Sequence, residues 1–493
     1  CLVSLINQQY NSMKKTVLIL AIVLLIAQTA QPFCGFYVAK ASTSLFNNKS
    51  QVILVRDGNL NTITMSNDFK GDVDQFAMVV PVPVILDRED IKVVSRGLFD
   101  RLDAYSAPRM VEYYDSNPCE VAEYELMEDA VSIGFMDNVA PISKSAVRKN
   151  KEYGVTIEAK YNVEEYDILI LSATKSTGLQ EWLEINGYKI PEKAQEVLKP
   201  YIKNKMKFFV VKVDTKKIKG NTEYLRPLQI SYHHDRFMLP IRLGMANSTG
   251  EQDMLVYAMS KKGRIECANY RTVKMPTDRN IPKFILDRSQ FGDFYKDAFE
   301  KAYDKEGKNA VFLEYAWNVS PQSGMMKCDP CVAPAPHWVD FQESGVKWIN
   351  QRSMGGSVYF TRLHVRYSRD QFPQDLLFLE TPNKENFQAR YVIHHPAYGD
   401  LSCDAGQDYL QDLKSRRKLE VDELRALTGW DKKSYGYYVH QYTVDIEDEN
   451  VVPVFWKGVS DGPMTMILAS IFMLSLLLTA IWFVRVNQRR ELA

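Results

Sequence analysis

The chain has 493 residues, of which 46% are hydrophobic and 12% aromatic, and its 61 basic residues balance its 61 acidic residues. This composition excludes a disordered or collagen-like chain, because it supplies enough apolar side chains to build a core. The neutral balance gives no electrostatic reason to expect nucleic acid as a partner. The length alone allows two or three domains.

The first apolar stretch of the chain follows a pair of lysines. It covers Val17–Ala27, and small residues then surround Ala30. A basic start, a short apolar run and a small-residue end are typical of a secretory signal peptide, so we assign residues 13–30 to one. Residues 1–12 are then expected to be an upstream extension of the gene model.

Residues 34–126 predict an N-terminal domain rich in β-structure. Apolar runs bounded by turn residues predict strands at Gln51–Val55, Thr62–Met65 and Phe76–Val80. The helical spacing of Leu98, Leu102 and Tyr105 predicts a short helix that ends before Pro108. Residues 127–153 show little periodicity and are expected to be a loop or linker.

Residues 154–460 mix both kinds of periodicity and predict an α+β main domain. Strands are expected at Val155–Ala159, Tyr166–Leu171, Lys207–Val213, Leu228–Tyr232, Leu239–Met245, Met254–Ser260, Arg264–Val273, Val311–Trp317 and Val358–Arg366. Helices are expected at Leu179–Ile185, Glu192–Lys203, Phe294–Ala302 and Asp404–Leu427. Gly429 is expected to cap the last of these helices. The sequence therefore predicts an α+β ectodomain with a substantial mixed β-sheet and flanking helices.

A second apolar run near the end of the sequence differs from the first in length. Residues Met464–Val484 carry no charge and, as a helix, would span about 30 Å, the thickness of a bilayer core. Three arginines follow within residues 485–493. By the positive-inside rule these arginines stay cytoplasmic, which predicts a single-pass membrane protein whose ectodomain faces out of the cell.

Six cysteines lie beyond residue 12, and an exported chain can oxidise them. They are Cys34, Cys119, Cys267, Cys328, Cys331 and Cys403. An even count in such a setting indicates disulfides that add to an existing core, although about 15 pairings remain open for six cysteines.

The sharpest local motif is the CxxC sequence that joins Cys328 to Cys331. Two cysteines at this spacing can cycle between dithiol and disulfide, as in a thiol–disulfide oxidoreductase. The prolines that follow them are hostile to the helix on which thioredoxin-type sites depend, so the sequence favours a structural disulfide, or pairing of each cysteine elsewhere. Zinc is disfavoured because no second ligand pair accompanies the motif.

Histidines and charges offer weaker candidates for a site. The pairs His233-His234 and His394-His395 are expected to point to opposite faces, which disfavours joint metal binding. On one predicted strand Arg362, His364 and Arg366 share a face, which fits either an anion-binding ladder or a solvated sheet face. The sequence contains no recognisable phosphate-loop, nucleophile-elbow, dinucleotide or metalloprotease motif, so we expect neither a cofactor nor a metal.

Nine short stretches of the sequence together carry a resemblance. They begin at Cys34 (CGFYVAK), Tyr105 (YSAPRMVEY), Tyr166 (YDILILSA), Trp182 (WLEINGY), Arg236 (RFMLPIRLGM), Asn269 (NYRTVK), Cys328 (CDPC), Thr361 (TRLHVRY) and Leu427 (LTGW). These stretches resemble an uncharacterised bacterial family of exported proteins with a domain of unknown function. The resemblance covers nearly the whole predicted ectodomain. It implies a bacterial envelope protein, anchored in the bacterial cell membrane with its ectodomain in the periplasm or outside, and it supplies no activity.

Two functions from different classes remain. The preferred one is a non-enzymatic envelope protein, anchored to the membrane through residues 464–484, that binds another protein, a peptide or a glycan or serves a structural role. The alternative is a thiol–disulfide oxidoreductase that uses Cys328 and Cys331. The sequence leaves enzymatic activity open and names no ligand.

Overall fold

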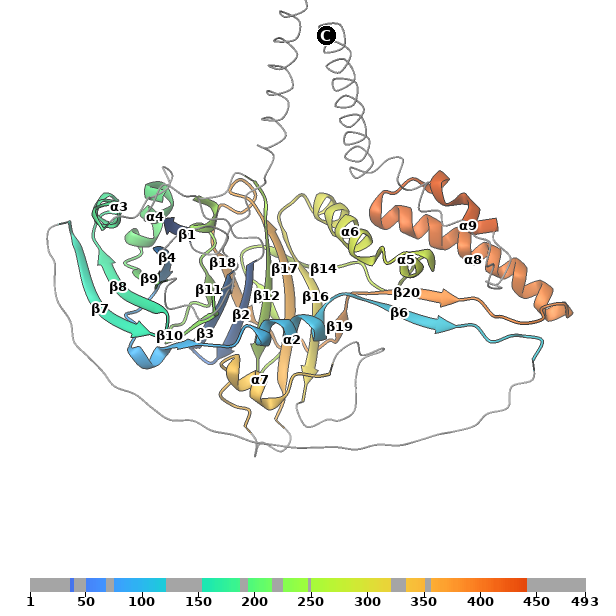
Figure 1. Cartoon of the computed structure of the whole chain (residues 1–493), viewed down its shortest axis with the longest axis horizontal. Helices are drawn as coiled ribbons and strands as arrows, with labels where there is room; N and C mark the ends of the chain where they lie inside the picture. The colour runs from blue at the N-terminus through green and yellow to red at the C-terminus, as the bar shows by residue number, and fades with distance from the viewer. Residues whose placement is uncertain are drawn as a thin grey trace, which may run out of the picture.

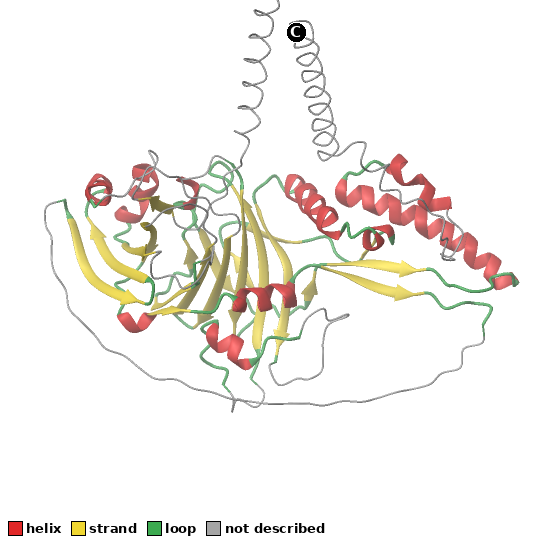
Figure 2. Ribbon diagram, viewed as in Figure 1, coloured by secondary structure: helices red, strands yellow, loops and turns green. Residues whose placement is uncertain are grey.

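The computed structural model describes residues 36–39, 50–67, 75–120, 153–186, 194–214, 225–246, 250–320, 334–350 and 356–440. Within these residues the strands form the body of the molecule and the helices lie at its periphery, as Figure 2 shows. The expected α+β class with a mixed sheet is confirmed. The helices are η1 (Arg88–Asp90), α2 (Gly97–Ser106), α3 (Ser176–Ile185), α4 (Ala194–Lys203), η3 (Gly244–Ala246), α5 (Phe284–Asp287), α6 (Phe291–Lys305), α7 (Trp338–Glu343), α8 (Asp404–Thr428), η4 (Lys432–Tyr435) and α9 (Gly436–His440).

A nine-stranded sheet occupies the centre of the described chain (Figure 1). Its order is β14 (Arg271–Lys274), β16 (Ala310–Val319), β17 (Val358–Tyr367), β12 (Gln252–Ser260), β2 (Ser50–Asp57), β3 (Leu60–Asn67), β10 (Leu228–His233) and β5 (Ile91–Val93), with β19 (Phe387–Gln388) paired to β16. Two of its pairings, β12 with β2 and β14 with β16, are parallel, and the others are antiparallel. We call it the central sheet.

Strand β2 shows why the central sheet is buried on both faces. Its residues Val52, Ile53, Leu54 and Val55 form a continuous apolar run and are each at most 2% exposed. Because side chains alternate along a strand, Val52 and Leu54 join one core cluster while Ile53 and Val55 join another. An apolar run without alternation is the pattern of a strand covered on both sides.

A second, five-stranded sheet packs against one face of the central sheet. Its order is β1 (Phe36–Ala39), β4 (Gln75–Val82), β9 (Lys207–Asp214), β8 (Tyr166–Ala173) and β7 (Val155–Val163), and every pairing in it is antiparallel. Ile168 and Ile170 of β8 share a core cluster with Val52 and Leu54 of the central sheet. Helices α3 and α4 cover the outer face of this sheet, and α2 and α7 cover the other face of the central sheet. The described chain is therefore layered as helices, sheet, sheet, helices.

Two three-stranded sheets complete the topology within the described residues. One has the order β11 (Met238–Leu239), β18 (Leu376–Glu380) and β13 (Ile265–Cys267), and the other has the order β15 (Arg279–Asn280), β20 (Arg390–His395) and β6 (Arg109–Tyr114). The strands of the second sheet are parallel. Strands β6 and β20 extend away from the central sheet with α8 beside them (Figure 1). We call β6, β20 and α8, with the connecting residues 115–120 and 396–403, the arm.

Helix α8 forms because its apolar residues recur at helical spacing. Leu413, Val421, Leu424 and Leu427 are buried along one side, and Val421 and Leu424 pack with β20 in a shared core cluster. The helix ends at Gly429, whose φ of 81° lies in the left-handed region and whose amide donates to the carbonyl of Arg425. The expected glycine cap is confirmed.

Two predicted strands are shorter in the structure than the sequence indicated. The run expected over Leu239–Met245 is a strand only at its start, because Pro240 supplies no amide for a ladder. The run expected over Arg264–Val273 divides into β13 and β14, separated by residues 268–270. The helix expected to end before Pro108 is confirmed as α2.

The sheets combine strands from either side of the expected linker at residues 127–153. Strand β4 pairs with β9, β2 pairs with β12, and β6 pairs with β20. Residues 34–126 and 154–460 therefore contribute to common sheets.

Several predicted segments lie outside the described residues. They are the extension at 1–12, the signal peptide at 13–30, most of the linker, the membrane helix at 464–484 and the tail at 485–493. In the part of the chain that the structure does describe, the helices are too short or too polar to cross a bilayer.

Candidate functional site

One pair of the predicted cysteines forms a disulfide. Cys119 follows β6 and Cys403 caps the start of α8, and their sulfur atoms are bonded although 284 positions separate them in the sequence. Gly406 makes this close approach possible, because a Cβ at that position would lie 2.9 Å from Sγ of Cys119 and 2.4 Å from the Leu401 carbonyl oxygen. The disulfide closes the end of the arm.

The other candidate cysteines do not join that pair. Cys267 is a buried free thiol, 8% exposed, and burial raises its pKa. A protonated, buried thiol is a poor nucleophile, so Cys267 has the character of a core residue. Cys34, Cys328 and Cys331 lie outside the described residues.

The histidine pairs do not chelate together. On β10 and just after it, Nδ1 of His233 lies 2.9 Å from the Asn59 side chain, while Nδ1 of His234 accepts from the Arg236 amide. On β20, His394 lies 3.8 Å from Asp115, and His395 bonds to Glu112 at 2.8 Å. Among the described residues no group of three or more histidine, cysteine, aspartate or glutamate side chains is arranged to hold a metal.

The charged face of β17 is buried beneath helices. Arg362 is 5% exposed, and the His364 and Arg366 side chains are 14% and 13% exposed. The ring of Phe299 on α6 stacks on His364 at 3.9 Å. Together with their carboxylate partners these residues form what we call the ionic cluster: Asp103, Asp253, Glu300, Glu314, Arg362, His364 and Arg366.

Glu314 and Asp253 organise the ionic cluster. Glu314 accepts from Nε of Arg362 at 2.5 Å and bonds to Nδ1 of His364 at 3.0 Å. Asp253 bonds to Nε2 of His364 at 3.1 Å and accepts from Nε of Arg366 at 2.9 Å. Asp103 of α2 and Glu300 of α6 complete the set by pairing with Arg362 and Arg366. Each cation on this face of β17 therefore has a carboxylate partner.

The same contacts shift the pKa values of the cluster. Burial alone would raise the pKa of Glu314, but Arg362 and His364 lower it to about 2. Burial alone would lower the pKa of His364, but Glu314 and Asp253 raise it above its ordinary value. His364 is thus held as a cation that donates from both ring nitrogens.

The ionic cluster corrects one interpretation of the sequence and weakens the other. The solvated-face interpretation of Arg362, His364 and Arg366 is wrong, because α2 and α6 cover these side chains. The anion-ladder interpretation lacks support, since internal carboxylates already take the donors. These pairs link α2 and α6 to β17, because Asp103 and Glu300 lie on the two helices.

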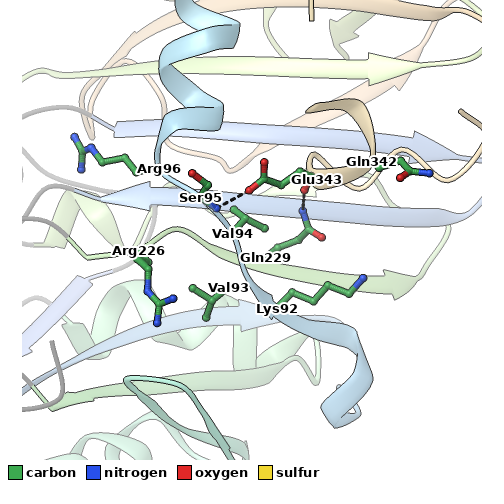
Figure 3. Close-up of a pocket in the computed structure, with 9 residues that line it drawn as sticks. All are labelled: Lys92, Val93, Val94, Ser95, Arg96, Arg226, Gln229, Gln342 and Glu343. Atoms are coloured by element: carbon green, nitrogen blue, oxygen red, sulfur yellow. Dashed lines mark hydrogen bonds between the residues drawn. The ribbon is translucent and has the colours of Figure 1, made fainter. Parts of the chain in front are cut away.

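A polar cleft of about 530 Å³ opens beside β5, where α2, α7 and β10 meet (Figure 3). The residues that line this polar cleft are Lys92, Val93, Val94, Ser95, Arg96, Arg226, Gln229, Gln342 and Glu343. They come from three regions that are distant in the sequence.

Internal bonds fix most of the polar groups of the cleft. Glu343 accepts from the Ser95 amide at 2.7 Å, and its own carbonyl accepts from Nε2 of Gln229 at 2.8 Å, as the dashed lines in Figure 3 show. Arg226 pairs with Glu164 and Glu165. The ammonium of Lys92 is exposed and has no ion-pair partner among the described residues. Within the described residues, the cleft is therefore a polar surface whose groups are mostly engaged internally, while Lys92 is exposed.

The arrangement is suited to binding. The cations Lys92, Arg96 and Arg226 project in different directions in Figure 3 and do not converge on one point. The nine lining residues include no histidine, cysteine or aspartate. This geometry has room for a polar ligand that spreads over the cleft.

Sequence reasoning missed the polar cleft and the partners of the ionic cluster. No local motif marks Lys92, Gln229 and Glu343, because only the pairing of β5 with β10 and the packing of α7 bring them together. The alternation on β17 did identify the three cations of the ionic cluster, Arg362, His364 and Arg366.

Comparison with known families places the chain in one of them. A family model described as "Uncharacterized protein conserved in bacteria (DUF2330)" matches residues 28–379. The chain belongs to this family, which confirms the resemblance found in the sequence. No curated protein matches the chain.

Solved structures give only distant likenesses. The crystal structure of baculovirus P35 is 11% identical and covers 70% of this chain and 98% of its own, with a TM-score of 0.24. The caspase-8/P35 complex structure is 11% identical and covers 69% of this chain and 94% of the matched chain, also with a TM-score of 0.24. A mutated baculovirus P35 after caspase cleavage is 10% identical over 44% of this chain and 68% of that chain, at a TM-score of 0.24. Likenesses at this level carry neither fold nor function to this chain.

Proposed function

We propose that this member of the family is an exported, single-pass membrane protein of the bacterial envelope whose ectodomain works by binding. The ectodomain comprises the layered sheets and the arm. Residues 464–484 anchor it, and residues 485–493 face the cytoplasm.

The observation that carries the proposal is the disulfide between Cys119 and Cys403. Disulfides persist in oxidising compartments such as the bacterial periplasm and are rare in the cytosol. The bond joins the segment that follows β6 to the N-cap of α8. In a compartment that keeps thiols reduced, the covalent link between Cys119 and Cys403 would not form.

The sequence supports the anchor and its direction. The charge-free run at residues 464–484 is long enough for a bilayer, and Arg485, Arg489 and Arg490 follow it directly. The basic and apolar segment at residues 13–30 supplies the export signal.

Binding is favoured over catalysis by the state of the described polar groups. The ionic cluster is saturated by its own ion pairs, and its central carboxylate, Glu314, is fully buried. In the polar cleft the side chains of Gln229 and Glu343 are engaged in internal hydrogen bonds. The polar groups of the cleft, held by these internal hydrogen bonds, offer a ligand a preformed surface, which suits recognition.

A topology experiment in spheroplasts tests the proposal. Two single-cysteine reporters would be compared: Leu419→Cys on α8, where the side chain is 64% exposed, and Asn487→Cys in the tail. A membrane-impermeant maleimide is expected to label position 419 in intact spheroplasts and position 487 only after permeabilisation. Labelling of position 487 from outside, or of neither position before permeabilisation, would overturn the proposal.

The thiol–disulfide oxidoreductase remains a second candidate because of the CxxC spacing of Cys328 and Cys331. A redox role requires that these two cysteines exchange with thiol–disulfide buffers whose reduction potentials lie in the range of glutathione. Mass-tagged thiol trapping in defined redox buffers would measure this exchange, with the Cys119–Cys403 pair as an internal reference. A Cys328–Cys331 bond that resists such buffers would eliminate the redox role.

A further inference from the structure

The outer edge of β6 offers main-chain groups for another strand. In the described residues β6 lies at the border of its sheet and pairs only with β20. The Arg109 amide donates to the Ala389 carbonyl at 3.1 Å, and the Asp115 amide donates to the His395 carbonyl at 3.0 Å. Because main-chain groups alternate in direction along a strand, those of Met110, Glu112 and Tyr114 face outward.

Exposed tyrosines gather beside this edge. Tyr114 is 72% exposed and stacks on His395 at a centroid distance of 4.2 Å, and Tyr113 is 38% exposed. Tyr398 is 75% exposed, and its carbonyl accepts from the Asn117 side chain, which brings it to the end of β6. Large aromatic side chains left in solvent are over-represented at protein interfaces.

The edge is held rigid on the arm. The Tyr409 hydroxyl donates to Asp115 at 2.6 Å, and Nη1 of Arg416 donates to the same carboxylate at 3.2 Å. Asp115 follows β6 directly, and the disulfide from Cys119 to α8 lies just beyond it. A preformed edge lowers the ordering cost of binding an extended chain.

The negative charge at the end of the arm favours some partner strands over others. Residues 110–120 and 396–410 contain no lysine or arginine. The acidic residues in these two stretches are Glu112, Asp115, Glu120, Asp400, Asp404 and Asp408. Arg416 offsets the charge of Asp115, but the other carboxylates leave the end of the arm acidic. A second copy of this chain would bring two acidic ends together, which is unfavourable, whereas a basic segment would be attracted.

We propose that the outer edge of β6 binds an extended, lysine- or arginine-rich peptide segment of a partner protein, which adds to the sheet as a further strand. The outward main-chain groups of Met110, Glu112 and Tyr114 supply the hydrogen bonds of this strand addition. Tyr113, Tyr114 and Tyr398 contact the side chains of this strand. The acidic residues at the end of the arm attract its lysines or arginines. The inference rests on the proposed binding function and names its surface and partner class.

Fluorescence anisotropy with the purified full chain in detergent tests the inference, and it does not depend on membrane topology. The probe is a labelled peptide of about ten residues that alternates valine and lysine, a length typical of a single strand. One control peptide carries glutamate in place of lysine. The other keeps the valine–lysine sequence but has N-methyl groups on alternate amides, which removes half of its main-chain donors.

The unmethylated basic peptide is expected to bind, and methylation is expected to weaken binding at least about tenfold because main-chain hydrogen bonds are lost. Glu112→Lys should weaken binding by about tenfold through charge reversal. Tyr114→Ala should weaken it roughly fivefold through the loss of aromatic contact. Tyr437→Ala, at a 48% exposed tyrosine on α9, is the matched control and should bind like the unchanged protein.

Each contrary outcome overturns the inference. If the methylated peptide binds as tightly as the unmethylated one, charge alone attracts it and no strand is added. If the full chain binds no basic peptide but a variant lacking residues 127–151 does, this chain's own segment occupies the edge. If Glu112→Lys and Tyr114→Ala retain their unfolding midpoints and bind normally, the peptide lies elsewhere.

Discussion

The ionic cluster of the central sheet and the end of the arm manage polar groups in opposite ways. In the cluster, Glu314 and Arg362 are each at most 5% exposed and each is fully engaged with charged neighbours. At the end of the arm, Glu112 and Tyr114 are exposed, and the strand that carries them has a single partner among the described strands. Buried and saturated charges specify packing, whereas exposed groups on a rigid support are available for recognition.

The two regions are also stabilised by different chemistry. The cluster depends on ion pairs between β16, β17, β12 and the helices that cover them, so it responds to protonation. The arm depends on a covalent bond between Cys119 and Cys403, so it responds to reduction. Perturbations can therefore be designed that affect one region and spare the other.

The largest effect is expected from Glu314→Ala. It leaves Arg362 and His364 buried without their shared carboxylate, which should lower the free energy of unfolding by about 3–5 kcal/mol. Denaturant unfolding would measure the loss. Glu385→Ala, which removes an exposed carboxylate paired with Lys274, is the control and should leave the midpoint unchanged. An unchanged midpoint for Glu314→Ala would show that the cluster does not hold the helices on the sheet.

Acid should destabilise the ionic cluster and leave the disulfide of the arm intact. The folded-state pKa of Glu314 is lowered to about 2 from the ordinary 4.5, so its contribution is present above pH 4.5 and is lost as the pH falls towards 2. That contribution is about 3 kcal/mol when full, since one pKa unit corresponds to about 1.4 kcal/mol. Stability measured from pH 6 to pH 2 should fall in the unchanged protein and fall less in Glu314→Gln, where Asp253, whose pKa is also lowered, keeps part of the acid dependence.

The raised pKa of His364 makes stability fall as the pH rises, on the alkaline side of the stability–pH profile. Its contribution is present below the ordinary value of 6.5 and is lost as the pH rises through the raised folded value. Stability should therefore be highest between pH 4.5 and 6.5, where both charges are formed. A flat profile across both limbs would contradict the paired state of the cluster.

Removal of the disulfide should loosen the arm and spare the cluster. The double change Cys119→Ser with Cys403→Ser is expected to cost about 2–4 kcal/mol. Amide hydrogen exchange should accelerate in β6 and at the start of α8, with little change in β16 and β17. Cys267→Ala, which removes a thiol that forms no disulfide, should lower stability less and leave exchange in the arm unaltered. Uniform acceleration across both regions would mean that the arm and the body unfold as one unit.

The smallest effect on stability is expected at the edge itself. Tyr114→Ala removes a 72% exposed side chain, so the free energy of unfolding should change by no more than about 0.5 kcal/mol. Thermal unfolding would measure the change, and peptide binding would be followed in the same preparation. A large loss of stability would mean that Tyr114 is part of the packing of the arm and is unsuitable as a recognition residue.

The sequence predicted the elements whose patterns are local. The apolar run of β2, the amphipathic α8 and the Gly429 cap could be found because one segment contains the whole signal. The arm's sheet was not predicted. Its strands β6 and β20 are short, and each is recognisable only when the other, distant in the sequence, is known to lie beside it.

The candidate sites could be predicted only in part for the same reason. The alternation of charged and apolar residues around His364 is the same whether the charged face is solvated or covered. Only the contacts of Asp103 and Glu300, on the covering helices, show that the face is covered. The cysteine count indicated disulfides but left the partner of Cys119 open, since spacing does not determine pairing.

The most direct test of the account is the redox state of Cys119 and Cys403 in living cells. Cells would be quenched in acid, and free thiols would be blocked with a first mass tag. Disulfides would then be reduced, and the released thiols would be labelled with a second mass tag. The account predicts that both cysteines carry the second tag, and that a parallel digest made without reduction contains them as one crosslinked peptide, as expected for an exported ectodomain. If both carry the first tag, they are free thiols in the cell, and the export proposal and the closed end of the arm are both contradicted.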